Sequence, residues 1–147
     1  MKSFKGRVIF PGYYKGAAVV SHYGVNTLAS FQTSALIPFS KKIIVGDQNN
    51  PDLYKKNITG KALVLPQTIG STTGGMVIQT VAVRDLSPKV WLFTDSIDPL
   101  AASGVILSNV WNDVGLIAID RLGRDFLEAV KTGDTIEVKD DGTVTIL

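Results

Sequence analysis

The apolar residues of this chain follow two kinds of pattern, short unbroken runs and longer stretches at helical spacing. The short runs, which are typical of buried strands, occupy residues 62–65, 89–93 and 116–119. Helical spacing of apolar residues is found between those runs, at positions 76–83 and 98–109. The second helical stretch begins with Asp98 as a suitable N-cap and Pro99 at the first helical position. This alternation predicts parallel strands joined by right-handed crossovers.

The two ends of the chain have the pattern of antiparallel strands. Near the N-terminus, strands are predicted at residues 7–10 and 17–21, on either side of a turn-rich link. Near the C-terminus, residues 135–138 and 143–146 flank Asp141-Gly142, the strongest short hairpin signal in the chain. We therefore expect an α/β fold in a single domain over residues 1–147, with a parallel βαβαβ core and added antiparallel strands.

Two further segments lie outside these patterns, one irregular and one helical. Residues 25–52 have no sustained period, and only a short strand at residues 43–45 is predicted within them. Residues 121–131 have the pattern of a third helix, which ends at Gly133.

Composition narrows the possible functions. The 147 residues are 45% hydrophobic, which is enough for a real core. The 15 basic and 13 acidic residues are interspersed, so neither a nucleic acid nor a membrane is an expected partner. With no cysteine and one histidine, the chain is not expected to hold a metal or an iron–sulfur cluster alone. No apolar signal region or membrane-length run is present, so we expect a cytoplasmic protein.

A run of small residues, Gly70-Ser71-Thr72-Thr73-Gly74-Gly75, connects the first buried strand to the first helix. At a helix N-terminus, free N–H groups and the helix dipole favour an anion, and glycines allow a ligand to approach the backbone. Ser and Thr are also preferred helix N-caps, so capping alone explains these residues equally well. Neither a GxGxxG motif nor a P-loop is present, because Lys61 precedes the strand. The residues alone indicate a candidate anion site.

Several motifs, in their order along the chain, resemble the aconitase X swivel domain family. They are Gly60-Lys61, Leu63-Val64-Leu65-Pro66, Gly70-Ser71-Thr72-Thr73-Gly74, Ser87-Pro88-Lys89-Val90, residues 98–106 and residues 141–146. The third motif is similar to the G-S-[ST]-T-G loop of that family. The resemblance extends over most of the chain and implies a swivelling domain of β/β/α type.

The resemblance also implies a function, that of the small subunit of a heterodimeric hydro-lyase that is inactive alone. A large aconitase X-like subunit would carry an iron–sulfur cluster, and this chain would bind no cofactor. Members of the family dehydrate cis-3-hydroxy-L-proline or (R)-mevalonate 5-phosphate. Ser71 falls on the serine that is the family's proposed proton acceptor. The residues expected to bind the carboxylate substrate are Gly70, Thr72, Thr73, Gly74 and Ser30.

Two departures from the family pattern bear on the substrate. Members of the family commonly have a loop similar to Ser-Phe-Trp-Gly-Gly-Val-Asp-Pro. This chain matches that loop only at Ser30-Phe31. Residues 66–69 lack the Gly-Arg pair often found before the glycine-rich loop, and with it a bidentate contact to a phosphate. We therefore rank cis-3-hydroxy-L-proline above (R)-mevalonate 5-phosphate as the expected substrate.

Two other functions stay open on the sequence. One is a non-catalytic module that binds small anions or another protein through the same loop. The other is a swivelling phosphocarrier, for which His22 is the only histidine available. If a partner subunit covers the loop, an exposed apolar patch is expected beside it.

Overall fold

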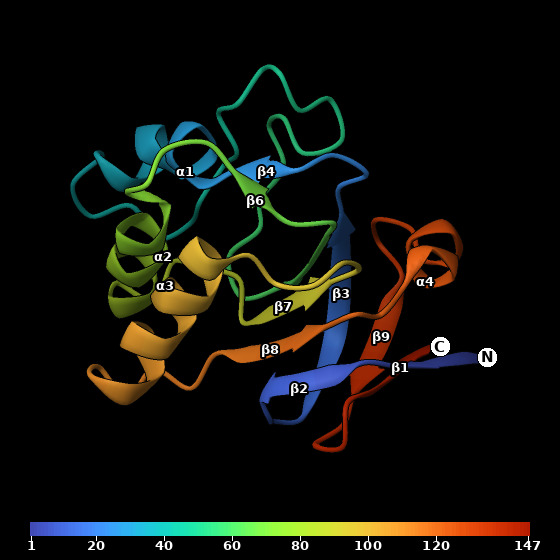
Figure 1. Cartoon of the computed structure of the whole chain (residues 1–147). Helices are drawn as coiled ribbons and strands as arrows, with labels where there is room; N and C mark the ends of the chain where they lie inside the picture. The colour runs from blue at the N-terminus through green and yellow to red at the C-terminus, as the bar shows by residue number, and fades with distance from the viewer.

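Ten strands and four helices follow one another in the computed structural model, which describes residues 1–147 (Figure 1). The strands are β1 (Lys2–Lys5), β2 (Arg7–Phe10), β3 (Tyr14–Val20), β4 (Val25–Asn26), β5 (Ala62–Leu65), β6 (Thr68–Ile69), β7 (Val90–Phe93), β8 (Ile117–Asp120), β9 (Thr135–Val138) and β10 (Thr143–Ile146). The helices are α1 (Thr27–Ala35), α2 (Gly74–Val83), α3 (Pro99–Val110) and α4 (Arg124–Ala129).

The parallel core predicted from the sequence is present. Strands β3, β5, β7 and β8 are parallel neighbours in that order. Helix α2 connects β5 to β7, and α3 connects β7 to β8. Every residue of β5, β7 and β8 is buried, as expected of parallel strands that are covered on both faces.

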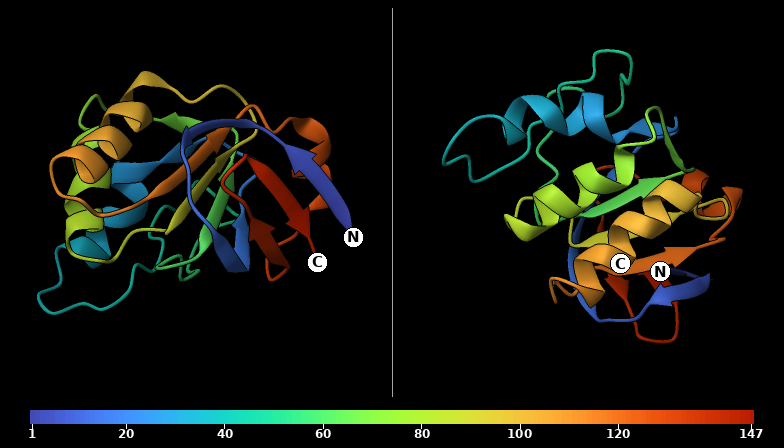
Figure 2. Two further views of the ribbon diagram at one scale, coloured as in Figure 1. Left: turned by 90° about the horizontal axis from the view of Figure 1, so that it is seen from below. Right: turned by 60° about the vertical axis from the view of Figure 1, so that its left-hand side comes forward.

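The elements form three layers. Helices α1, α2 and α3 cover one face of the parallel strands, and β1, β9, β10 and α4 lie on the other side (Figures 1 and 2). Strand β3 belongs to both β layers, because residues 14–17 pair with β9 and residues 18–20 pair with β5. Gly6 lies between β1 and β2, where the chain passes from one β layer to the other. A Cβ at this position would lie 2.4 Å from the Asp120 carbonyl oxygen, so the close approach of the chain there requires glycine. The β/β/α arrangement implied by the family resemblance is confirmed.

Each interface between layers has its own hydrophobic core. Between the helices and the parallel strands, Trp91 stacks on Phe93 with their ring centres 6.2 Å apart, and Phe31 meets Trp91 edge-on. Between the two β layers, Phe126 of α4 packs edge-on against Phe4 at 5.2 Å. Successive residues of the buried strands alternate between these two cores, which is the two-residue period of a strand.

Helix α1 lies in the segment to which the sequence assigns no helix. Its N-terminus is capped by Asn26, whose side-chain oxygen accepts a hydrogen bond from the Ala29 N–H at 3.0 Å. Its buried face includes the polar residues Thr27, Ser30 and Ser34. These polar positions interrupt the apolar period, so the pattern alone does not show the helix.

Three further assignments differ from expectation. The strand predicted at residues 43–45 is wrong, since Ile44 forms only an isolated bridge with Asn57. The helix predicted at residues 121–131 is shorter, because Gly123 at φ +90° interrupts the helical backbone before Arg124. Strands β1, β4 and β6 are present in the structure but are not predicted from the sequence.

No helix in the structure combines the length and the hydropathy needed to cross a membrane.

Candidate functional site

The glycine-rich loop begins beyond the carboxyl end of β5 and is held in place by α3. Immediately before the loop, β6 pairs in parallel with β4, which precedes α1. The Thr68 N–H and hydroxyl donate to the two carboxylate oxygens of Asp98, at 2.8 and 2.6 Å. Asp98 also accepts from the Ala101 N–H at 3.0 Å as the N-cap of α3. One carboxylate therefore fixes both the start of α3 and the path of the loop.

Gly70 allows the loop to approach the N-terminus of α1 closely. Its φ is +103°, and a Cβ at this position would lie 2.7 Å from the Asn26 Nδ2 atom. A larger residue would be strained by this backbone conformation and would clash with the cap of α1. Gly70 thus brings the candidate site and the first turn of α1 together.

The Ser71 side chain is exposed and points back toward Thr73. Its Oγ accepts from the Thr73 N–H at 3.2 Å and lies 2.9 Å from the Thr73 hydroxyl oxygen. Neither contact caps α2, since the Thr73 N–H belongs to the residue before the helix. The oxygen that the family resemblance identifies as the proton acceptor therefore accepts one hydrogen bond from the backbone and lies within hydrogen-bond distance of a second hydroxyl.

The N-terminus of α2 differs from those of α1 and α3. Thr73 is its N-cap residue by position, with a helical backbone conformation, and no side chain caps the helix. The N–H groups of Gly75 and Met76 have no acceptor within the chain. Asn26 and Asp98, by contrast, cap α1 and α3. Because three hydroxyl groups stand beside free amides without capping them, the geometry favours the anion-site interpretation over capping alone.

The predicted substrate-binding residues fall into an exposed group and a buried group. Gly70, Thr72 and Thr73 are exposed beside Ser71, whereas Gly74 is buried and its carbonyl accepts from the Thr27 hydroxyl at 3.4 Å. Ser30 is fully buried in α1, and its hydroxyl has no hydrogen-bond partner. Contact between Ser30 and a substrate on the loop would require α1 to move, so its binding role stays a prediction.

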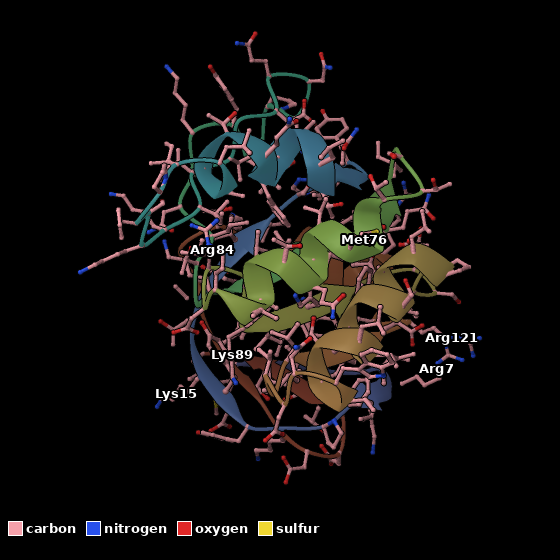
Figure 3. The ribbon with its side chains drawn as sticks, turned by 90° about the vertical axis from the view of Figure 1, so that its left-hand side faces the viewer. Arg7, Lys15, Met76, Arg84, Lys89 and Arg121 are labelled. Carbon is pink, nitrogen blue, oxygen red and sulfur yellow. The ribbon has the colours of Figure 1, made fainter.

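Two arginines at the carboxyl end of β8 are absent from the predicted site. Arg121 follows β8 at φ +57°, and the only hydrogen bond of its side chain is from Nε to the Ser96 hydroxyl at 3.1 Å. Arg7 donates from Nε and Nη2 to Asp120, at 2.9 and 2.6 Å. Figure 3 shows the two arginines close together at one edge of the molecule. Ligands of α/β proteins commonly bind where the parallel strands end. This rule identifies the end of β8, at Arg121, as well as the end of β5, beyond which Gly70 lies.

The buried carboxylate of Asp120 anchors this edge. Burial alone would raise its pKa, but hydrogen bonds from Arg7 and the Ile97 N–H, with the charges of Arg7 and Arg121, hold the pKa below its ordinary value. Asp120 therefore stays ionised and orients Arg7, while the outer N–H groups of Arg121 are free to meet a ligand.

His22 lies apart from the glycine-rich loop. Its Nδ1 is 2.9 Å from the Asp52 carboxylate, which also accepts from the His22 backbone N–H at 2.7 Å. These two contacts fix a turn after β3, and no glycine-rich anion loop adjoins the imidazole. The geometry gives the phosphocarrier hypothesis no further support.

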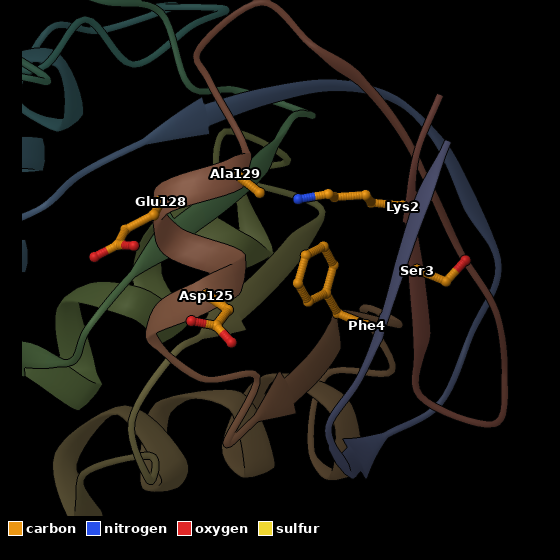
Figure 4. Close-up of a pocket in the computed structure, with 6 residues that line it drawn as sticks. All are labelled: Lys2, Ser3, Phe4, Asp125, Glu128 and Ala129. Atoms are coloured by element: carbon orange, nitrogen blue, oxygen red, sulfur yellow. The ribbon is translucent and has the colours of Figure 1, made fainter.

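The largest hollow on the surface lies elsewhere, between β1 and α4 (Figure 4). It measures about 490 Å³ and is open and largely polar, with Lys2, Asp125 and Glu128 at its rim. The Ser3 hydroxyl there is bonded to Thr145 at 2.9 Å. Nothing in this hollow combines an available nucleophile with free donors, so it is not the candidate site.

The chain has no ligand set for a metal cluster. It contains no cysteine, and no three His, Asp or Glu side chains converge. An iron–sulfur cluster therefore does not fit the residues of this chain.

Together, the fold and the loop define a swivel-type β/β/α domain with an uncapped helix N-terminus behind a Gly-Ser-Thr-Thr-Gly sequence. The chain belongs to the aconitase X swivel domain family, whose sequence profile matches residues 3–146.

Relatives match the chain over nearly its whole length. The phosphomevalonate dehydratase small subunit of Methanocella arvoryzae is 31% identical over 143 residues, 97% of this chain and 96% of the relative. The protein of the same name from Methanocaldococcus jannaschii is 32% identical over 144 residues, with the same coverage of each. The crystal structure of Thermococcus kodakaraensis aconitase X in its holo-form has a TM-score of 0.82 at 27% identity, covering 100% of this chain and 99% of that chain.

Proposed function

We propose that this chain is the small subunit of a dehydratase that acts on (R)-mevalonate 5-phosphate. The observation that carries the proposal is the end-to-end match to relatives named phosphomevalonate dehydratase small subunit. The relatives favour this substrate over cis-3-hydroxy-L-proline, which the sequence pattern ranks first. The name of these relatives also implies a large-subunit partner.

The position of Arg121 supports a phosphorylated substrate. Residues 66–69 lack the Gly-Arg pair that could bind a phosphate. This absence argues against a phosphorylated substrate only if no other arginine lies at the same edge of the sheet. Arg121 stands at the carboxyl end of β8, which is parallel to β5 and separated from it by β7, with one side-chain N–H on Ser96 and the others free. A guanidinium group in that position can make charge-assisted hydrogen bonds to a phosphate or a carboxylate.

Ser71 is proposed to take the proton in this reaction. Dehydration removes a proton from the carbon beside the carboxylate and hydroxide from the adjacent carbon, which leaves a carbon–carbon double bond and water. A serine hydroxyl is a poor base in water, so its oxygen must be stabilised as an alkoxide-like group. The N–H and hydroxyl of Thr73 can both donate to Ser71 Oγ, and the positive end of α2 lies directly behind them.

The free amides of α2 are proposed to hold an anionic group of the substrate. The N–H groups of Gly75 and Met76 have no other acceptor, and the Thr72 hydroxyl is exposed beside them. Such donors lose strength in water, so the site gains its full effect only when another chain excludes solvent from the exposed loop. This requirement accounts for a subunit that is inactive alone.

The iron–sulfur cluster implied by the family resemblance would lie on the large subunit. This chain has no cysteine to ligate it. The contribution of this chain is a base, a set of anion-binding donors and a cover for the site.

The test is turnover by the chain co-expressed with its large subunit, measured separately on (R)-mevalonate 5-phosphate and cis-3-hydroxy-L-proline. We expect kcat/KM to be higher for the phosphorylated substrate by at least about 100-fold, the discrimination available when a site's charged donors lose their partner. Preference for hydroxyproline would overturn the substrate assignment. No turnover of either by an assembled complex would favour the non-catalytic binding module.

A further inference from the structure

The helical layer of this domain is unusual because its three helices contain no charged residue. Asp, Glu, Lys and Arg are absent from α1, α2 and α3, although they make up 19% of the chain. Helix α4, on the opposite side of the molecule, has charged residues at three of its six positions. A helix that faces only water normally carries charges on its outer surface. The outer surface of α1, α2 and α3 is therefore suited to contact with another protein, where charged residues are depleted.

Large apolar side chains are exposed on this same layer, which faces the viewer in Figure 3, where Met76 is labelled. Those on the helices or directly after them are Leu36, Ile37, Phe39, Met76, Val83, Ile106, Val110 and Trp111. Phe39 and Trp111 are 95% and 79% exposed. An exposed apolar surface of this breadth marks an interaction site in a soluble protein. We call the outer surface of α1, α2 and α3, with these side chains, the helical face.

The segment after α1 is fixed in a way that presents its apolar residues outward. The Arg84 guanidinium, at the end of α2, donates to the carbonyl oxygens of Ala35 and Ile37. Phe39 has φ +63°, a conformation rarely adopted by a bulky residue, and its ring is almost fully exposed. Arg84 thus fixes the residues just before Phe39, whose ring faces solvent.

A groove in the helical face leads directly to the candidate site. It lies between α1 and α2, has a volume of about 320 Å³ and is lined mainly by apolar side chains. Its lining residues include Leu28, Leu36, Met76 and Thr73. Thr73 is also the residue whose N–H and hydroxyl meet Ser71 Oγ. The groove and the glycine-rich loop therefore form one continuous surface.

We propose that the helical face is the docking surface for the large subunit, with an apolar ridge of that subunit seated in the groove between α1 and α2. The proposal rests on the proposed function, because the loop continuous with the groove needs a second chain to exclude water from Ser71. A second copy of this chain fits less well as the occupant. It would cover one Ser71 loop with another and leave no chain to supply a substrate site.

The proposal is tested by affinity for the isolated large subunit, measured by titration without substrate. The variants are Leu36→Glu in the groove and Trp111→Glu at the far end of α3, and neither residue belongs to the proposed substrate site. The control is Leu147→Glu, an exposed apolar residue at the C-terminus beside β9. Circular dichroism and thermal melting check that all variants fold.

We expect each helical-face variant to weaken binding by about 30-fold or more, because an unpaired carboxylate would be buried at the interface. The control should bind within about twofold of wild type, as surface changes outside an interface do. Wild-type affinity in both helical-face variants would overturn the docking surface while leaving the proposed function intact. No complex with the wild-type chain would overturn the proposed function itself. A self-association of the isolated chain that these variants abolish without affecting the heterodimer would assign the face to a second copy.

Discussion

Thr73 contributes two potential donors to the Ser71 oxygen and leaves the amides behind it free. Because its backbone N–H and its hydroxyl lie 3.2 and 2.9 Å from Ser71 Oγ, the serine is oriented before a substrate arrives. The free N–H groups of Gly75 and Met76 continue the same row of donors into α2. At the residue scale, the site is an oxygen surrounded by donors on one side and open to solvent on the other.

Arg121 gives a prediction at this scale. Arg121→Ala should raise KM for (R)-mevalonate 5-phosphate by about 10- to 100-fold with little change in kcat, because charge-assisted contacts to the bound anion would be lost. Steady-state kinetics of the reconstituted complex measure this change. The matched control is Arg124→Ala, which removes a nearby exposed arginine whose ion pair is with Glu128 at 3.9 Å. An unchanged KM in Arg121→Ala would show that the phosphate is bound elsewhere.

The residues of the site were only partly predictable from sequence. The loop is predictable because six small residues in a row are conspicuous between a strand and a helix. The family resemblance indicates Ser30, yet its burial depends on the packing of a helix that the pattern does not reveal. Arg121 carries no local signal of its own, since its place at the site follows from the order of strands in the sheet.

The close crossing of α2 and α3 positions the glycine-rich loop at the scale of elements. Gly75 and Gly104 face each other, and a Cβ on Gly104 would lie 2.8 Å from the Gly75 carbonyl oxygen and 2.9 Å from Ile78 Cβ. The first turn of α2 can therefore rest directly on α3, whose own N-cap Asp98 holds Thr68. The two helices and the loop form one unit.

Gly104→Ala should destabilise the fold despite the better helix propensity of alanine. Propensity alone would add about 0.5–1 kcal/mol of stability, whereas forcing a methyl group into this contact costs about 1–3 kcal/mol. We expect a net loss in the free energy of unfolding, measured by urea denaturation, and lower turnover because the start of α2 shifts. Ser103→Ala, which removes only a hydroxyl bonded to the Leu100 carbonyl, is the control. A more stable Gly104→Ala protein would contradict the close crossing.

Strong local patterns account for the elements that were predicted correctly. The buried strands β5, β7 and β8, the Asp98-Pro99 helix start and the Asp141-Gly142 hairpin each have a signal within a few residues. Helix α1 and the β4–β6 pair lack such a signal. Their stability comes from the Asn26 cap, from contacts of buried polar side chains and from the path imposed by Asp98 on the loop.

The whole molecule has two contrasting sides. Helices α1, α2 and α3 contain no charged residue and the helical face exposes large apolar side chains, while the side formed by α4 and the antiparallel strands is polar and charged. The candidate site lies at the border of the helical face, where the parallel strands end. This arrangement suits a subunit that covers a partner and completes a site at the junction, and a closing motion of such a cover would exclude water from Ser71.

The most direct test of this account is the turnover of (R)-mevalonate 5-phosphate by the reconstituted complex containing Ser71→Ala. We expect kcat to fall by about three orders of magnitude or more while the complex still assembles, the scale expected when a base is removed. Ser3→Ala, which removes an exposed hydroxyl bonded to Thr145 on the other side of the molecule, should retain nearly full activity. Turnover close to wild type in an assembled Ser71→Ala complex would contradict the central claim and place the base on the large subunit.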